Sequence, residues 1–478
     1  MFEWIKKLFS KSKEKVEKKV ERSYVEKLIQ NWEMSKSRKM MITGEDYYRG
    51  KQDILNKKRL VRNEKGDLVE NFALVNHKII DNQYSKLVDQ KVNYLVGKPI
   101  SFKSKDEKYA EELQKIFDKN FHRKFKYLTE NALNNGVGWL HPYYDNEGNF
   151  KLRQFEPSEI LPIYKDKDKE ELEMVIRVYK EAVLGTYETI EKVEVYKKNG
   201  IDRYVRKRGV CSLECENIPY VIFTEGEEEK PFNWAKIPFI PFRYNQQEIP
   251  LIARVKSLQD AINTIVSNFQ DNVTEDIRNT IFVLVNFGGE DPADFRRDLQ
   301  DGIIKVNAVE GISGDVKTLQ VEVNSENYKT ILEMLKKAII ENGRGFDAKD
   351  DRMSNNPNQM NIQSMYADID LDANNMETEF QASFEQLLWF VNVHLRKDKD
   401  PTLEVIFDRD VLVNEGQTIE NIAKSVGIIS EETLVSMHPF VAEPKAELER
   451  MKKEKEEKIN QYPEAFGNGP GDPDVKEE

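Results

Sequence analysis

Hydrophobic residues recur every three or four positions over several long stretches of the chain, and this spacing predicts amphipathic helices. These stretches are residues 73–96, 105–135, 251–276 and 326–342, and residues 12–40 predict a further, highly charged helix. The longest pattern runs from Ile362 to Leu395 without glycine or proline. A helix of that length exceeds the width of a small domain, so we expect it to cross between parts of the protein.

Alternating apolar and polar residues, which are typical of strands, fill the region between these helices. Residues 139–157 predict two strands joined by an Asn-Glu-Gly turn. Further strands, which would form a meander, are predicted at residues 174–180, 192–198, 203–207 and 220–226. Residues 237–245 contain Pro238 and Pro241, and because proline is confined to sheet edges, they predict an edge strand or an extended connector.

A small mixed insert follows the helix predicted at residues 251–276. It contains predicted strands at residues 281–287, 302–307 and 316–323 and a predicted helix at residues 291–301. Asp291 and Pro292 suit the start of that helix. Residues 403–412 predict a short strand, and residues 417–460 predict two or three helices. The chain is therefore predicted to be α+β.

Length and charge narrow the class of protein. A chain of 478 residues predicts about three domain-sized units or one large irregular unit. Its net charge is −12, although residues 1–40 carry twelve Lys or Arg against six Asp or Glu. Because affinity for nucleic acid comes from neutralising phosphates, an acidic balance argues against a protein that holds DNA tightly over a broad surface.

The basic N-terminus does not have the layout of a secretory signal, because no apolar core followed by a cleavage site is present. No run of 18 apolar residues occurs, so no membrane-spanning helix is predicted. Phe2, Trp4 and Leu8 lie beside lysines and leave open a helix on a membrane surface. The apolar part lasts barely two turns, so an ordinary arm is the simpler interpretation.

The sequence lacks the common catalytic motifs, including phosphate-binding glycine loops, GxSxG and HExxH. Its five histidines, which show no metal-ligand spacing, are His77, His122, His141, His394 and His438. Cys211 and Cys215 lack a second pair for zinc, and two cysteines favour a reducing compartment over a disulfide framework. We predict no catalytic residue, no metal site and no cofactor.

One acidic stretch resembles a calcium-binding loop. Asp368, Asp370, Asp372, Asn374 and Glu379 occupy its positions 1, 3, 5, 7 and 12. The sixth position, which needs glycine for a sharp turn, is Ala373. The apolar pattern of the long helix also continues through this stretch, and side chains on a helix would diverge. We therefore interpret it as a solvated acidic face of the helix.

A polar segment without charge precedes the long helix. Residues 353–367 contain no Asp, Glu, Lys, Arg or His, although one-third of the whole chain is charged. Residues 351–366 include four Asn, two Gln and three Met. A flexible surface linker would explain this composition.

The order of these elements resembles that of the portal proteins of tailed bacteriophages, of the siphophage type. The resemblance extends from about Tyr47 to Leu395 and rests on several phrases in order. These phrases are DNQYSKLVDQKVNYLVGKPISF, ENALNNGVGWLHPYYDNEGNFKLRQFEPSEILPIY, IPFIPFRYN and NQMNIQSMYADIDLDANNMETEF. The fold that the resemblance implies is a portal fold with long stem and wing helices, a β-rich wing, a small α/β clip and a helical crown.

The resemblance implies a division of the chain into nine parts. They are a basic arm at residues 1–40, the wing at 41–250, stem helices at 251–276 and 325–347, the clip at 277–324, a tunnel loop at 348–361, a long wing helix at 362–397, the crown at 398–460 and a disordered acidic tail at 461–478. About twelve copies would form a ring around a channel for double-stranded DNA at one vertex of the capsid.

The same resemblance implies which residues carry function. The tunnel loop would present Arg352, Met353, Ser354, Asn355, Asn356, Asn358 and Gln359 to the channel. The lysines of the stem that could line the channel are Lys256, Lys329, Lys336 and Lys337. The clip would contact the motor and the adaptor through Asp294, Arg296, Arg297 and Asp298.

The partners implied are further copies of the chain, the large terminase subunit, a head-completion protein, the major capsid and scaffolding proteins, and DNA that passes without sequence-specific binding. The protein would reside in the virion, and in the host cytoplasm during assembly. Two alternatives stay open from sequence alone. They are a nucleic-acid-processing enzyme of the packaging machinery and a membrane-associated scaffold anchored by the N-terminal arm.

Overall fold

The computed structural model describes residues 22–461 except residues 64, 73, 184, 187, 226–227, 277–280, 286–314, 320–324, 348–358, 410–413 and 442. In this part of the chain, no helix combines the length and the apolar character needed to cross a membrane. The residues form two compact units, which are considered separately. The first comprises the chain up to Phe346 together with Asp368–Asp410, and the second comprises Asp347–Ala367 together with the chain from Val411.

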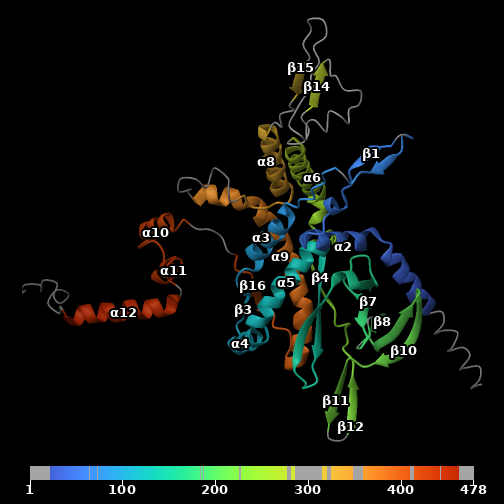
Figure 1. Cartoon of the computed structure of the whole chain (residues 1–478). Helices are drawn as coiled ribbons and strands as arrows, with labels where there is room; N and C mark the ends of the chain where they lie inside the picture. Colours follow the sequence, from blue (N-terminus) through green and yellow to red (C-terminus); the bar gives the residue numbers. More distant parts are fainter. Residues whose placement is uncertain are drawn as a thin grey trace, which may run out of the picture. The chain divides into compact units, whose positions relative to one another are not determined.

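A five-stranded antiparallel meander dominates the sheet-rich part of the first unit (Figure 1). Its strands, in spatial order, are β10 (Val210–Ile218), β9 (Gly200–Lys207), β8 (Thr189–Lys197), β7 (Leu172–Ala182) and β6 (Ile160–Tyr164). The three meander strands predicted within residues 174–207 are confirmed, whereas β6 and β10 were not predicted. A 3₁₀ turn, η2 (Pro157–Glu159), leads into β6.

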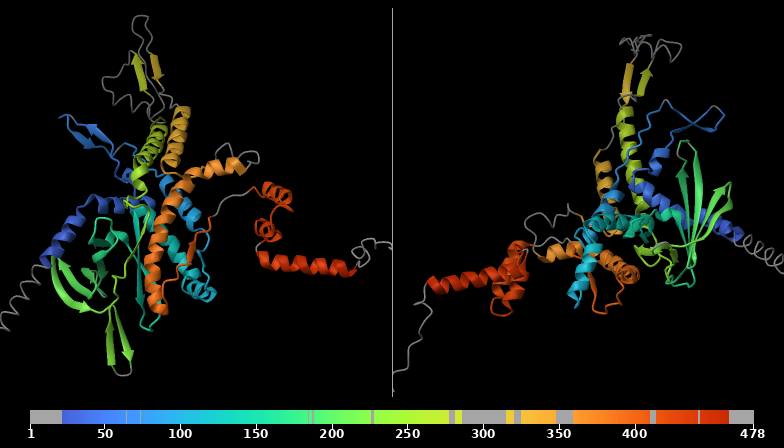
Figure 2. Two further views of the ribbon diagram at one scale, coloured as in Figure 1. Left: turned by 180° about the vertical axis from the view of Figure 1, so that it is seen from behind. Right: turned by 90° about the horizontal axis from the view of Figure 1, so that it is seen from below.

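The N-terminal helices lie against this sheet (Figure 2). Val25, Ile29 and Trp32, from the helix of residues 22–33, are buried with Ile176 and other side chains of the sheet. A single helix over residues 12–40 was predicted, and that prediction is wrong in its described part. The helix ends before Ser35, whose side chain accepts a hydrogen bond from Arg38 N and caps a second helix, α2 (Lys36–Tyr48).

A three-stranded antiparallel sheet forms the centre of the first unit. Its order is β13 (Ile240–Arg243), β4 (Val137–Tyr144) and β5 (Phe150–Phe155). The predicted pair of strands within residues 139–157 is thus confirmed. The proline-containing segment forms β13, an edge strand, which is one of the two alternatives predicted for it. Proline fits there because the outer side of an edge strand needs no ladder donor.

Helices α3 (Gln83–Val96), α4 (Glu107–Ile116), α5 (Lys119–Asn135) and α9 (Gln359–Leu395) supply most of the remaining core. The rings of Phe125 and Phe242 lie 5.7 Å apart, and each lies 5.2–5.7 Å from the rings of Phe380 and Phe384, centroid to centroid. The long helix predicted from Ile362 is therefore confirmed. The single helix predicted at residues 105–135 is wrong, because Asp118 caps a new helix by accepting a hydrogen bond from Phe121 N.

Two further helices, α6 (Ile252–Asp276) and α8 (Ser325–Asn342), pack side by side (Figure 1). Strands β14 (Ile281–Val285) and β15 (Asp315–Leu319) pair antiparallel at the end where the two helices are joined. Both helices and these two strands of the insert were predicted. The helix predicted at residues 291–301 and the strand predicted at residues 302–307 lie outside the described residues.

Three small strand pairs complete the first unit. A 3₁₀ turn, η1 (Asp53–Asn56), leads to the hairpin of β1 (Leu60–Arg62) and β2 (Leu68–Glu70). A second hairpin joins β11 (Val221–Glu225) to β12 (Glu228–Phe232). Strand β3 (Ser101–Lys103) pairs with β16 (Glu404–Ile406), which falls inside the short strand predicted at residues 403–412.

The second unit is helical in its described part. It contains α10 (Glu415–Lys424), α11 (Glu431–Ser436) and α12 (Pro444–Gln461), in agreement with the two or three helices predicted there. Asn414 and Ser430 cap α10 and α11 through their side chains. The combination of sheets and helices confirms the α+β class. The N-terminal residues 1–21 and the acidic tail from residue 462 lie outside the described residues.

Candidate functional site

The candidate site is built around the pair α6–α8, which carries all four lysines predicted to line a channel. Facing aromatic and polar groups hold the two helices together. The rings of Phe269 and Tyr328 lie 5.0 Å apart, and Asn272 Nδ2 donates a hydrogen bond to Tyr328 Oη at 2.9 Å. This contact aligns the C-terminal half of α6 with the N-terminal half of α8, so the pair forms one element.

Two of the predicted lysines form ion pairs within the chain. Lys256 Nζ lies 2.5 Å from Asp53 Oδ2 and 2.8 Å from Asp260 Oδ2. Lys336 Nζ lies 2.6 Å from Asp81 Oδ2. Lys256 therefore links α6, and Lys336 links α8, to another segment of the first unit, and the charge of each lysine is already balanced.

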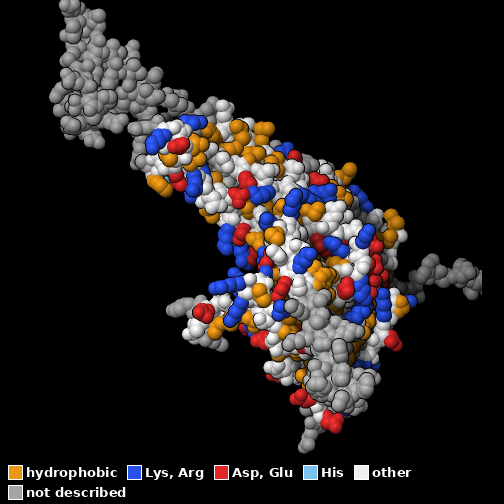
Figure 3. All heavy atoms as spheres, turned by 90° about the vertical axis from the view of Figure 1, so that its right-hand side faces the viewer, with side chains coloured by type: hydrophobic (Ala, Val, Ile, Leu, Met, Phe, Trp, Pro, Cys, Tyr) orange, Lys and Arg blue, Asp and Glu red, His pale blue; other side chains and the backbone are white. Residues whose placement is uncertain are grey.

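The other two predicted lysines lie on an exposed charged face of α8. This face consists of Glu326, Lys329, Glu333, Lys337 and Glu341. Lys329 Nζ is 4.0 Å from Glu333 Oε1. Acids and lysines alternate here rather than forming a basic stripe, and Figure 3 shows the same mixture of blue and red side chains over the face it presents.

The buried side of α6 is polar, which is unusual for a helix inside a protein. Four side chains spaced by four residues are completely buried there: Gln259, Asn263, Ser267 and Asp271. Their oxygens accept main-chain N–H hydrogen bonds of 2.7–3.0 Å, Gln259 from Tyr84, Asn263 from Asp81, Ser267 from Ile79 and Asp271 from His77. We call this row the polar ladder of α6.

The polar ladder explains why the helix predicted at residues 73–96 is wrong in its first part. The described residues from 74 to 82 belong to no helix or strand, and α3 begins only at Gln83, after the cap Asn82. Their donors at residues 77, 79 and 81 meet acceptors four residues apart on α6, which is the spacing of an extended segment that runs along a helix. Buried main-chain donors must find acceptors. Here α6 supplies acceptors at the spacing of its own turns, so this segment is held without a helix or a sheet of its own.

Asp271 gathers more partners than the other residues of the polar ladder. Its carboxylate receives Lys57 Nζ at 2.7 Å, Arg59 NH1 at 3.3 Å and the His77 ring Nδ1 at 2.9 Å. Burial by itself would raise the pKa of Asp271, but hydrogen bonds from Lys57 and His77 outweigh burial and lower it. Asp271 is therefore an ionised anchor on α6 for the two segments that flank the β1–β2 hairpin, through Lys57 and Arg59 before it and His77 after it.

The stretch that resembles a calcium loop is helical and is only partly solvated, so the prediction of a solvated acidic face is wrong for Asp372. Asp372 is buried and contacts Lys91 Nζ at 2.8 Å, Tyr244 Oη at 2.6 Å and Arg254 NH1 at 3.0 Å. Burial would raise the pKa of Asp372, but these partners, Lys91 foremost, hold it below its ordinary value. Asp372 thus ties α9 to α3 and α6.

Other acids of the same stretch also have protein partners. Arg409 NH1 lies 3.1 Å from Asp370 Oδ1, and Arg409 NH2 lies 2.5 Å from Glu377 Oε2. Within the described residues, no group of three or more His, Cys, Asp or Glu side chains is arranged to hold a metal ion. Asp370 and Glu377 thus share one cation, Arg409, whereas Asp372 lies against Lys91 and Arg254.

The sequence matches a family model described as phage portal protein, SPP1 Gp6-like, over residues 26–461. This chain belongs to that family of phage portal proteins. It is 28% identical over 455 residues to the portal protein of Bacillus phage SPP1, covering 92% of this chain and 88% of the relative. It is 31% identical over 421 residues to the portal protein of Clostridium phage phiCD119, covering 84% of this chain and 90% of the relative. The resemblance inferred from the sequence is thus confirmed.

Two sets of predicted portal residues lie outside the described part of this family member. They are the tunnel-loop residues Arg352, Met353, Ser354, Asn355, Asn356 and Asn358, and the clip residues Asp294, Arg296, Arg297 and Asp298. Gln359 is the first residue of α9. The four predicted lysines lie on α6 and α8, and their role stays a prediction, as do the roles of the other two sets.

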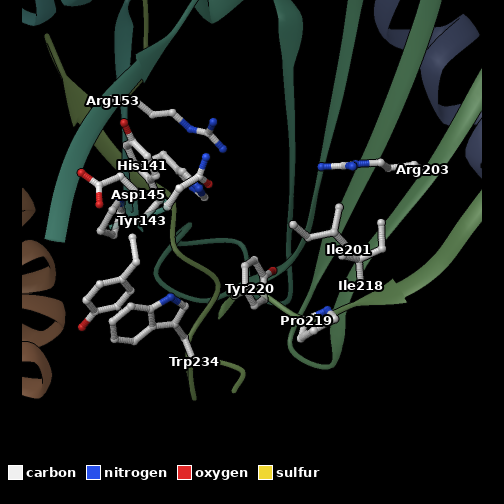
Figure 4. Close-up of a pocket in the computed structure, with 13 residues that line it drawn as sticks. His141, Tyr143, Asp145, Arg153, Ile201, Arg203, Ile218, Pro219, Tyr220 and Trp234 are labelled. Carbon is white, nitrogen blue, oxygen red and sulfur yellow. The ribbon is translucent and has the colours of Figure 1, made fainter. Parts of the chain in front are cut away.

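A cavity of about 420 Å³ opens between the two main sheets of the portal-family chain (Figure 4). His141 and Arg153 lie on one wall, and Ile201 and Arg203 lie on the opposite one. The His141 ring is buried, and its Nδ1 is 2.6 Å from the carbonyl oxygen of Pro238. Because that nitrogen is held by the main chain, His141 is a structural residue rather than a base.

Sequence reasoning missed the polar ladder and the burial of Asp372. A signal for the polar ladder was present, because Gln259, Asn263, Ser267 and Asp271 recur at intervals of four. Such a row marks one face of a helix. The row does not reveal whether that face meets water or buried main chain, since polar side chains suit both.

Proposed function

We propose that this protein assembles into a ring, with about twelve copies, at one vertex of a phage capsid and provides the channel for packaging and ejecting double-stranded DNA. The observation that carries the proposal is membership of the phage portal family over residues 26–461. Both relatives are portal proteins, and each covers more than four-fifths of this chain. In this role the protein is a structural conduit, and ATP hydrolysis belongs to a separate motor.

The charge distribution of α8 supports a channel that does not hold its cargo. Lys329 and Lys337 alternate with Glu326, Glu333 and Glu341 on the exposed charged face. Phosphate binding strengthens with each cation that is free to displace counterions. A face with mixed charges offers passing DNA few cations that are free to bind phosphates, so the DNA can slide past it. The two fully paired lysines, Lys256 and Lys336, would instead stabilise the wall.

The decisive experiment is to determine the mass and shape of the assembled protein. Native mass spectrometry and negative-stain images of the purified chain should show closed rings of about twelve copies. A monomer or dimer under every salt condition would reject the proposal. Magnesium-dependent nuclease or ATPase activity that is lost on a point substitution would favour an enzyme of the packaging machinery instead.

We place the tunnel loop at residues 348–361 and the clip at residues 277–324. Deleting Ser354–Asn358 should leave rings intact but disturb packaging or DNA retention, because this uncharged part of the loop would contact DNA. Charge reversal at Arg296 and Arg297 should impair packaging with rings intact, because the clip would contact the motor. Packaging at the wild-type level in either variant would refute the corresponding assignment.

A further inference from the structure

The β1–β2 hairpin projects from the first unit and exposes hydrophobic side chains (Figure 1). Leu60, Leu68 and Phe72 are 51%, 61% and 88% exposed. We call strands β1 and β2 together with Phe72 the arm, which is distinct from the basic N-terminal arm of residues 1–40. In the part of the chain that the structure describes, the arm is a two-stranded sheet without a third strand. A hairpin of this size has marginal stability in water unless it packs on something.

The arm is nevertheless built to hold a definite position. At its tip, Asn63 Oδ1 accepts hydrogen bonds from Lys65 N at 3.0 Å and Asp67 N at 2.9 Å. At its base, Asn71 N donates to Arg59 O at 2.9 Å, and Arg59 pairs with the buried Asp271. A segment that is anchored at its base and ordered at its tip, with exposed apolar side chains, has the properties of a docking element.

Helix α8 presents a second exposed apolar face. Ile331 and Met334 are 47% and 67% exposed, and Ala338 follows them one turn later. The spacing of three and four places these residues on one face, distinct from the side of Tyr328 and Ile339 that packs inward and from the charged face. We call Ile331, Met334 and Ala338 the apolar face of α8.

The arm and α8 lie on opposite sides of α6 (Figures 1 and 2). One chain therefore cannot bring its arm onto its own α8 without crossing α6. Two different surfaces that the described part of the chain leaves exposed, on opposite sides of one helix, suit head-to-tail association, which generates rings when the rotation closes. Two copies related by a twofold axis would instead pair identical surfaces.

We propose that the arm of one copy packs on the apolar face of α8 of the neighbouring copy. This inference rests on the proposed ring and assigns the contact between neighbours within it. Asp271 acts as a positioning residue, since it fixes the base of the arm to α6. The contact also leaves the charged face of α8, with Lys329 and Lys337, free of the interface.

Cross-linking of two different variants tests the contact directly. Cys215 is exposed and Cys211 is buried, so Cys215→Ser provides a background with few reactive thiols. In that background, one preparation carries Leu68→Cys and a second carries Met334→Cys. The two are mixed before assembly and treated with a short bismaleimide. The expected product is a cross-linked heterodimer, because the partners are on different chains, with little product from either variant alone.

The outcomes separate this proposal from the proposed function. Rings with no heterodimer would overturn the arm contact and leave the ring proposal standing. Cross-linked dimers from Leu68→Cys alone would show arm-to-arm pairing and overturn the head-to-tail contact. Absence of rings from the wild-type chain would reject both proposals. A mass measurement on the same samples decides between these cases.

A second measurement uses surface substitutions with a matched control. Leu60→Ser, Leu68→Ser and Phe72→Ser together should raise the concentration for half-assembly at least tenfold. The melting temperature of the monomer should stay unchanged, because these side chains are already exposed. Ile222→Ser, on the β11–β12 hairpin, removes a side chain of similar exposure (53%) and should leave assembly unchanged. Equal effects of the two changes would overturn the assignment.

Discussion

Helices α6 and α9 both bury one side within the first unit, but the two sides are opposite in character. From Ile369 to Val391, α9 buries mainly apolar residues such as Phe380 and Phe384, with Asp372 as a charged exception. In α6, the polar ladder is as fully buried as the apolar residues beside it. The difference lies in what each helix contacts: α9 packs against other side chains, whereas α6 packs against the main chain of an extended segment.

This comparison shows that burial of a helix face does not require it to be apolar. A buried polar group is tolerated when its hydrogen bonds are satisfied. The polar ladder satisfies main-chain groups that would otherwise lack partners, so its polarity is a structural requirement. Five changes test the comparison, and we give them in order of expected effect.

Removing an aromatic ring from the core of α9 should have the largest effect. Phe384 is surrounded by Phe125, Phe242 and Phe407, at centroid distances of 5.5–6.0 Å. Phe384→Ala should lower the free energy of unfolding by about 4 kcal/mol, because it removes apolar contact and leaves a cavity. Urea denaturation followed by tryptophan fluorescence measures this. Leu371→Ala, on an exposed part of the same helix, is the control and should cost less than about 0.5 kcal/mol.

Replacing Asp372, the buried charged residue of α9, should lower the free energy of unfolding nearly as much as Phe384→Ala. Asp372→Ala would leave the buried ammonium of Lys91 without its carboxylate, and breaking such a pair costs about 3 kcal/mol. The double variant Asp372→Ala with Lys91→Met should recover part of this loss. If the double variant were less stable than Asp372→Ala alone, the pair would not be the cause.

An apolar residue placed in the polar ladder should destabilise the protein even though the site is buried. Asn263→Leu removes the acceptor for Asp81 N, and a buried donor without a partner costs about 1–3 kcal/mol. The free energy of unfolding measures the loss. Hydrogen exchange at Asp81 should accelerate as well. An unchanged or increased stability would mean that α6 behaves as an ordinary apolar helix.

Acid should weaken the first unit through His141. Burial, foremost, lowers the pKa of this ring in the folded chain well below 6.5. Below about pH 6.5 the unfolded chain therefore binds a proton that the folded chain does not. Stability falls as pH decreases from that value toward the folded pKa, by about 1 kcal/mol over the first unit of pH. In His141→Gln, the slope of stability against pH should decrease, whereas His438→Gln in the second unit should leave it unchanged.

The smallest effect is expected for the most exposed of these contacts, the ion pair between Lys336 of α8 and Asp81 of the extended segment. Lys336→Ala breaks the contact with Asp81, in which Lys336 is 37% exposed. Pairs that water reaches contribute about 0–1 kcal/mol, so the loss should stay below about 1 kcal/mol and shrink in high salt. A loss above 2 kcal/mol would place this pair among the buried anchors, with Asp372.

Much of the architecture followed from the sequence because it depends on periodicity alone. The long pattern from Ile362 predicted α9, the alternation within residues 174–207 predicted the meander, and the prolines near Ile240 predicted an edge strand. The breaks at Ser35 and Asp118 were missed. Each is decided by a side-chain cap, and one capping residue is a weak signal within a long charged or apolar pattern.

The sequence determined by itself the helices, most strands and, through the order of its elements, the portal family. Only the tertiary structure decided which helix faces are buried. Val273 belongs to the apolar spacing of α6 yet is exposed, whereas Asp271 two residues earlier is buried. The physical reason is that the segment packed against a helix decides which of its faces is buried. Residues 74–82, which are distant from α6 in the sequence, present main-chain donors that need acceptors, and the buried face of α6 is polar because it supplies them.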